Sequence, residues 1–327
     1  MNRRVNQGAD WVSKEHAVFF RHHHLSQDKL WKGKFDGQEI NDDSPYPMML
    51  IQDIVGRVIP YSHDGRCKIS LIESDSLQEE RLSFALGGEE SNLSEAVIKF
   101  VRQCAHYLMK YQEAIYDIVT LHSREDDSFV GFQLRIIPPL SVRKRFGKWT
   151  QYVPEEIARE KGTSTKIELS YDHLVVFRLP RDLKNVIKRT LKQVSFIGKH
   201  IASDFVGASL RGETLVRYDF DELNYSQKMA MAEATKDVGW NARNYFSDEV
   251  LEFYELDRYA VQAIFVANIR QLIFSTLNFE IARVASTVGV MGKIIIEGLP
   301  TLSDYQEIRK ELHEGKKEFN TIFKMLS

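Results

Sequence analysis

Residues 114–139 read AIYDIVTLHSREDDSFVGFQLRIIPP, and this stretch decides the fold. Its two ends, Ala114–Val119 and Phe129–Ile137, are rich in β-branched and aromatic residues, which are typical of strands. The polar segment Glu125–Ser128 between them predicts a turn. Pro138 and Pro139 predict the end of the second strand, because proline has no N–H to donate to a sheet.

The elements around this stretch alternate between helix and strand. Asn92–Tyr111 has apolar residues at helical spacing, and Asn92 with Glu95 fits a helix start. After Pro139 we expect a short segment at 147–153, a charged loop at 154–164 and a last strand at 167–179 that ends at Pro180. Upstream, residues 48–58 predict a short helix and residues 68–73 a strand.

The second half of the chain is predicted to be mainly helical. Residues 181–205 form one amphipathic pattern, residues 224–244 a helix broken near Gly239, and residues 247–286 either one long helix or two stacked ones, with Ser247 as N-cap. A β-branched strand is expected at 293–297, and Ser303 is expected to cap a last helix that reaches about 326.

These patterns predict an α+β fold with three parts. Residues 1–45 are polar and irregular, with scattered aromatic residues, and are expected to form an extended arm that gains order against something else. Residues 46–180 are expected to form a mixed α/β lobe, and residues 181–327 a helical lobe with long helices. A chain of 327 residues is long enough for two such lobes.

Composition excludes some classes of protein. Lys plus Arg is 44 and Asp plus Glu is 46, giving a net charge of −2, which argues against a surface that is basic throughout but leaves room for a local basic patch. The two cysteines, Cys67 and Cys104, lie far apart in the sequence and form no CxxC motif. This pattern is explained most simply by a reducing, cytosolic compartment. We expect no signal peptide, and no apolar run reaches the roughly 18 residues of a membrane helix.

No motif predicts a catalytic or cofactor site, so we expect a protein that is not an enzyme. The chain has no GxSxG elbow, no GxxxxGK[ST] phosphate loop and no dinucleotide fingerprint. The paired carboxylates, such as Asp126-Asp127, fall in turns or exposed faces, and Lys166–His173 has the wrong order for a PD-(D/E)xK nuclease.

The histidine-rich segment is the only metal-like cluster. Consecutive histidines at 22–24 cannot all face one ion from a regular element, even with His16 nearby, and no neighbouring cysteine or carboxylate pair completes a ligand shell. We therefore assign no metal site and expect adventitious binding of nickel or zinc.

The helix predicted at 181–205 carries the best candidate surface for a polyanion. Lys184, Lys188 and Lys192 lie four residues apart and line one stripe, and Arg189 and Lys199 extend the positive surface. Their charges could meet phosphates or form a subunit interface. The alternative, which we favour, is that they face water or pair with acidic residues of a neighbouring subunit.

Four segments resemble tailed-bacteriophage portal proteins: the first three, in order, resemble the wing region, and the fourth resembles the strand and turn that portals place before a helix. They are Tyr111–Val119 (YQEAIYDIV), Leu134–Val142 (LRIIPPLSV), Tyr171–Pro180 (YDHLVVFRLP) and Gly292–Leu299 (GKIIIEGL). The resemblance implies a portal-like fold, in which 46–180 is a wing-like domain and 181–327 a stem- or clip-like domain. It also implies that residues 11–35, rich in aromatics, wrap an adjacent subunit or bind the capsid.

The function that this resemblance implies is mechanical. A homo-oligomeric ring would let double-stranded DNA pass non-specifically during packaging and ejection. Its partners would be the major capsid protein, the terminase and a head-completion adaptor, without a membrane. The protein would be found in the virion, and in the host cytoplasm during assembly. Two alternatives remain: a metal-dependent intracellular enzyme acting on nucleic acid, and a non-viral oligomeric scaffold.

Overall fold

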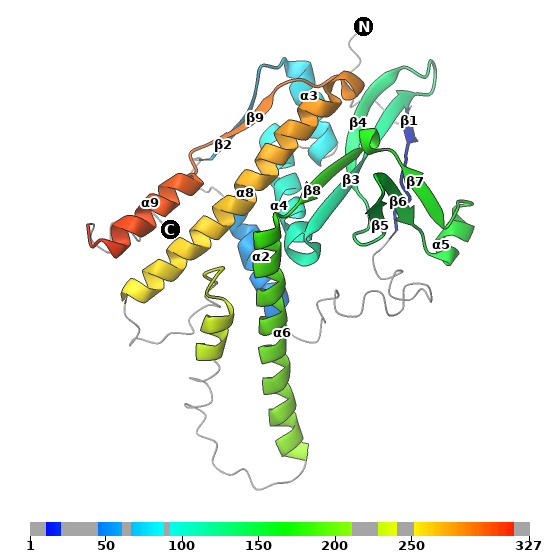
Figure 1. Cartoon of the computed structure of the whole chain (residues 1–327). Helices are drawn as coiled ribbons and strands as arrows, with labels where there is room; N and C mark the ends of the chain where they lie inside the picture. Colours follow the sequence, from blue (N-terminus) through cyan, green and yellow to red (C-terminus); the bar gives the residue numbers. More distant parts are fainter. Residues whose placement is uncertain are drawn as a thin grey trace. The chain divides into compact units, whose positions relative to one another are not determined.

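The computed structural model describes residues 11–20, 45–60, 67–87, 92–210, 228–240 and 252–316, without the side chains of 199–210, 252–253 and 286–287. The fold is mixed α+β, with about 54% helix and 22% strand, which confirms the predicted class (Figure 1). The chain divides into two compact units. Unit 1 comprises 1–38, 59–179 and 272–299, and unit 2 comprises 39–58, 180–271 and 300–327. The boundary near 180 is common to these units and the predicted lobes, while residues 46–58 fall in unit 2 and residues 272–299 in unit 1.

The main sheet of unit 1 is built around strand β3 (Glu113–Ser123). Strand β4 (Phe129–Ile136) pairs antiparallel with one side of β3, as the sequence of two strands and a turn predicted. On its other side, β3 pairs with β8 (Leu174–Arg178) through residues 113–117 and with β1 (Trp11–Lys14) through residues 120–123. Part of the expected arm, residues 11–20, is therefore packed on its own chain.

A second, three-stranded sheet follows β4. It contains β5 (Val142–Arg145), β6 (Lys148–Tyr152) and β7 (Lys166–Leu169), all antiparallel. The single strand predicted at 167–179 is wrong, because a 3-10 turn (Tyr171–His173) separates β7 from β8 and the Ser170 hydroxyl accepts a hydrogen bond from the N–H of Asp172. The segment predicted as a charged loop contains helix α5 (Glu155–Glu160).

Helix α4 (Leu93–Tyr111) forms the core of unit 1 together with β3 and β8. Asn92 caps it as predicted, accepting a hydrogen bond of 2.9 Å from the N–H of Glu95. Phe100 is 2% exposed, and its ring lies 4.9 Å from Tyr116 on β3 and 5.8 Å from Phe177 on β8, measured between centroids. Such aromatic contacts add directional packing to the burial of apolar area.

Two further elements complete unit 1. Helix α3 (Ser76–Gly87), which the sequence did not predict, packs against α4 and β4. Strands β2 (Lys68–Ile72) and β9 (Lys293–Glu297), both close to their predicted positions, pair antiparallel with Ser70 opposite Ile295. This pair joins segments that lie far apart in the sequence.

Unit 2 is helical. Helix α2 (Pro45–Val58) packs against α6 (Arg181–Leu210). Helix α8 (Glu252–Val288) is one continuous helix of 37 residues, which resolves the choice left open by the sequence, and it contributes to both units. The predicted cap Ser247 and the helix end beyond 316 lie outside the described residues.

Helix α9 (Leu302–His313) begins one residue before the predicted cap. Its N-cap is Thr301, which forms a complete capping box with Asp304, so the prediction of Ser303 is wrong. The Asp304 carboxylate accepts hydrogen bonds from the N–H and hydroxyl of Thr301, and these bonds lower its pKa. Two candidate capping residues in TLSD made the sequence ambiguous at this position.

One described helix passes the length and composition test for a membrane span. The segment is Tyr254–Ala285 of α8, and 56% of its most apolar window is buried inside the protein. Arg258, Arg270 and Glu280 are also buried on this helix. Core helices of globular proteins share these properties.

Gly239 lies close to the backbone of helix α8. Its φ is +64°, and a Cβ there would lie 2.3 Å from the carbonyl oxygen of Arg258 and 2.4 Å from the backbone N of Gln262. Arg258 Nη1 donates to the carbonyl of Ala232 (3.0 Å) and Nη2 to the hydroxyl of Thr235 (2.8 Å). The Arg258 guanidinium thus holds residues 228–240 against α8.

Replacing Gly239 tests this packing. We expect Gly239→Ala to lower the free energy of unfolding by roughly 2–4 kcal/mol, since an alanine would be strained at positive φ and would collide with backbone atoms. The measurement is urea unfolding followed by circular dichroism. Gly56→Ala is the matched control, because a Cβ at that helical position meets nothing within 4 Å and should be neutral or stabilising. Equal stability of the two variants would contradict the close approach.

Candidate functional site

The predicted lysine stripe lies on the exposed side of α6. Lys184, Lys188 and Lys192 are all exposed, while Ile187 and Val194, on the flanking face of the helix, are fully buried. Residues four apart rise about 6 Å along a helix, so the three ammonium groups are spread over roughly 12 Å. The stripe therefore offers a line of positive charge of the kind that can contact successive phosphates.

Not all the predicted residues belong to this stripe. Arg189 forms an ion pair with Asp237, and both residues belong to unit 2. The side chain of Lys199 lies outside the described residues. Within the described part of the chain, no ion pair of the three lysines is seen. The geometry thus leaves the lysines, rather than Arg189, as the candidate polyanion surface.

A second polar cluster lies where residues 15–18 pass alongside β3. Asp117 is completely buried, and its carboxylate accepts hydrogen bonds from the backbone N–H groups of His16 (2.9 Å) and Ala17 (3.2 Å). One carboxylate oxygen also lies 3.3 Å from Nδ1 of His16. The buried carboxylate therefore satisfies backbone groups that β3 itself does not bond, and it fixes the N-terminal segment on unit 1.

The ring of His16 stacks on that of His173, with centroids 3.7 Å apart and ring planes at 6°. Burial lowers the pKa of His173, and nearby His16 lowers it further, against the opposing charges of Asp117 and Asp172. Nδ1 of His173 is buried and has no hydrogen-bond partner. This pair of rings therefore favours a neutral His173.

Neither cluster has the composition of a metal centre. Among the described residues, no group of three or more His, Cys, Asp or Glu side chains is arranged to hold an ion. His22, His23 and His24 lie outside the described residues, so their predicted adventitious binding stays a prediction. Cys104 is buried, and this burial raises the pKa of its thiol, which keeps it protonated and unreactive.

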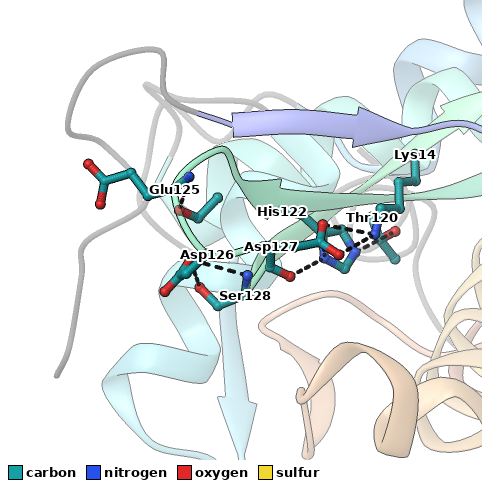
Figure 2. Close-up of polar contacts among 8 residues, drawn as sticks. Lys14, Thr120, His122, Glu125, Asp126, Asp127 and Ser128 are labelled. Carbon is teal, nitrogen blue, oxygen red and sulfur yellow. Dashed lines mark hydrogen bonds and ion pairs between the residues drawn. The ribbon is translucent and has the colours of Figure 1, made fainter.

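The paired carboxylates Asp126 and Asp127 have structural partners in the β3–β4 turn. Figure 2 shows Lys14 donating to both carboxylate oxygens of Asp127, at 3.0 and 3.2 Å. Asp126 accepts from the N–H and hydroxyl of Ser128, and His122 contacts the Asp127 carbonyl at 3.0 Å. These contacts are typical of turn stabilisation, and they confirm that the pair lies in a turn.

The sequence reasoning missed one cluster of basic residues. Residues 142–148 read VRKRFGK and form most of a hairpin between β5 and β6. The sequence did contain a signal for a basic surface, because four cations and one phenylalanine lie within these seven residues. The sequence predicts a short segment only at 147–153, and strand β5 lies before it.

Neither the family models nor the curated proteins that were compared with this chain show a match.

Removing the Asp117 carboxylate should release the N-terminal segment. We expect Asp117→Leu to leave the N–H groups of His16 and Ala17 buried without acceptors, at roughly 1–3 kcal/mol each. Hydrogen exchange should then show loss of protection at these two amides while α4 remains protected. Asp117→Asn is the control, because its amide oxygen can still accept from both N–H groups. Protection that persists in Asp117→Leu would show that the carboxylate does not fix the segment.

The histidine pair predicts the direction of a pH effect. Because the folded pKa of His173 is lowered, the unfolded chain binds more protons as the pH falls through its unfolded value of about 6.5, and the folded state loses stability. We expect unfolding free energy, measured in urea at pH 7.5 and 5.5, to fall less in His173→Phe than in the wild type. His122→Phe, near the end of β3, serves as control. An unchanged pH dependence in His173→Phe would refute this assignment.

Proposed function

We propose that this protein is a portal-like structural component that forms an oligomeric ring through which phage DNA is packaged and ejected. The observation that carries the proposal is the order of elements from α4 to α6. A helix leads directly into β3, β4 ends before Pro138-Pro139, a short hairpin follows, and β8 ends before Pro180 and a long helix. This is the order in which the portal-like segments occur in the sequence.

Charge supports a role in conducting DNA rather than gripping it. A ring that held phosphates tightly would stall a sliding duplex, because each phosphate contact adds affinity. The chain carries a net charge of −2, and its α6 stripe consists of exposed lysines, whose contacts are weakened by salt. Such a surface suits a transient contact with DNA or an acidic neighbouring subunit.

Exposed apolar side chains support a role in assembly. Phe279 is 64% exposed and Met291 is 60% exposed, and both belong to unit 1. Single exposed apolar residues are common, but neighbouring subunits of a closed ring would remove them from water. The proposal also includes the major capsid protein, the terminase and a head-completion adaptor as partners, and the virion as the final location.

The first test is the oligomeric state of the full-length protein. We expect light scattering to give a mass of many subunits and negative-stain images to show closed rings with an open centre. Rings should persist on dilution, since each subunit contacts two neighbours. A stable monomer or dimer at high concentration would contradict ring formation as a property of the chain alone.

Two further measurements separate the alternatives. Metal-dependent cleavage of DNA that is lost in His22→Ala/His24→Ala would favour the nucleic-acid enzyme. Rings that bind neither a capsid protein nor a terminase would favour a non-viral scaffold.

A further inference from the structure

The β5–β6 hairpin presents an unusual group of side chains. Its two-residue loop, Phe146-Gly147, has positive φ at both positions, +48° and +81°, as a type I′ turn requires. Glycine adopts this conformation freely, but a bulky residue such as phenylalanine is strained there. Phe146 is also fully exposed, so neither packing nor backbone preference explains its presence.

The register of the sheet shows which residues share its outer face. Arg143 pairs with Thr150 and Arg145 with Lys148, while Thr150 pairs with Glu168 and Tyr152 with Lys166 on β7. Residues on alternate positions of a strand point to the same side. The outer face therefore carries four cations, namely Arg143, Arg145, Lys148 and Lys166, and one carboxylate, Glu168.

Lys148 is the cation of this face that pairs with Glu168. Lys148 lies 3.2 Å from Glu168, but both side chains remain largely exposed, at 72% and 66%. An ion pair this exposed contributes little and can exchange for another anion. Arg145 and Lys166 are also exposed, and Lys166 lies 5.9 Å from the centre of the Tyr152 ring.

The opposite face of the hairpin anchors it to unit 1. Val142 and Trp149 are 6% and 4% exposed and belong to one hydrophobic cluster with Ile115 and Leu174 of the main sheet. Lys144 and Arg178 lie over Trp149, at 5.4 and 4.9 Å from its ring. The outer face is thus presented by a hairpin whose inner face is packed, which limits the entropy lost on binding.

We propose that the outer face of the β5–β7 sheet, together with Phe146, is a nucleic-acid-binding surface. Arg145, Lys148 and Lys166 contact backbone phosphates, and the exposed ring of Phe146 stacks on a base. Same-face residues on a strand are about 6.8 Å apart, so neighbouring cations reach different phosphates. A strained, fully exposed aromatic ring beside clustered cations matches the two chemistries of a nucleic acid, an anionic backbone and flat bases.

An anionic membrane is a weaker match. Membrane-surface binding scales with the apolar area that is buried, and this face offers one exposed apolar side chain. The inference does not require ring formation, so it stands or falls separately from the proposed function.

The test uses the full-length protein and two fluorescein-labelled probes, a 30-nucleotide single strand and the corresponding duplex. Binding is measured by fluorescence anisotropy from 50 to 250 mM NaCl. We expect Arg145→Ala/Lys148→Ala to weaken binding to both probes and to reduce the salt slope on the duplex by about 1.8, as expected for two lost phosphate contacts. The matched control is Arg159→Ala/Lys161→Ala, which removes two exposed cations from α5 and the residue after it, outside the sheet.

A third variant isolates the aromatic contribution. Phe146→Asn creates Asn-Gly, the preferred pair for this turn, so folding is favoured while the ring is removed. We expect about tenfold weaker binding to the single strand, with an unchanged salt slope. Circular dichroism and thermal unfolding verify that all variants fold.

Three outcomes would overturn the inference. Equal loss in the two double variants would show a general charge effect. If Phe146→Asn bound the single strand with full affinity, the Phe146 ring would make no stacking contact with a base. Binding to vesicles of anionic phospholipid, with no binding to either oligonucleotide, would assign the surface to a membrane.

Discussion

The hydrogen bonding of β3 on both sides is the constraint on which unit 1 depends. Its first half bonds to β8, its second half to β1, and most of its other side to β4. Both edges of β3 are thus paired over most of their length, and its residues 114–119 are all buried. Helix α4 then covers the aromatic residues of β3 and β8, so that Phe100, Tyr116 and Phe177 from three elements pack together.

On the side of β3 that β8 and β1 share, residues 118 and 119 are paired with neither strand, and Asp117 is the last residue paired with β8. A strand pair would satisfy the backbone N–H groups of His16 and Ala17, but the chain bends away from β3 at this point and the carboxylate replaces the missing acceptors. A buried carboxylate is tolerable only with such donors around it. The histidine stack beside it is a consequence of this local arrangement and needs no catalytic role.

Much of unit 1 could be predicted because its signals are local. The periodicity of Asn92–Tyr111, the β-branched runs around the Glu125–Ser128 turn and the prolines at 138–139 all act within a few residues. Strand β1 could not be predicted, since four residues become a strand only through pairing with β3 more than 100 positions away. The same limit applies to the site, where helical spacing predicted the lysine stripe of α6 but not the ion pair between Arg189 and Asp237.

The β5–β6 hairpin illustrates a different limit. Arginine and lysine have weak strand preference, so the local sequence alone does not favour β5, and the hairpin is stabilised by its turn and by burial of Trp149. The net charge of −2 also gives no indication of this basic hairpin, because composition averages over the whole chain. Both basic surfaces, the lysine stripe in unit 2 and the hairpin face in unit 1, occur on a nearly neutral protein. The phosphate contacts that we propose for them would be few and weakened by salt on such a background, which would suit a polyanion that must bind and then move.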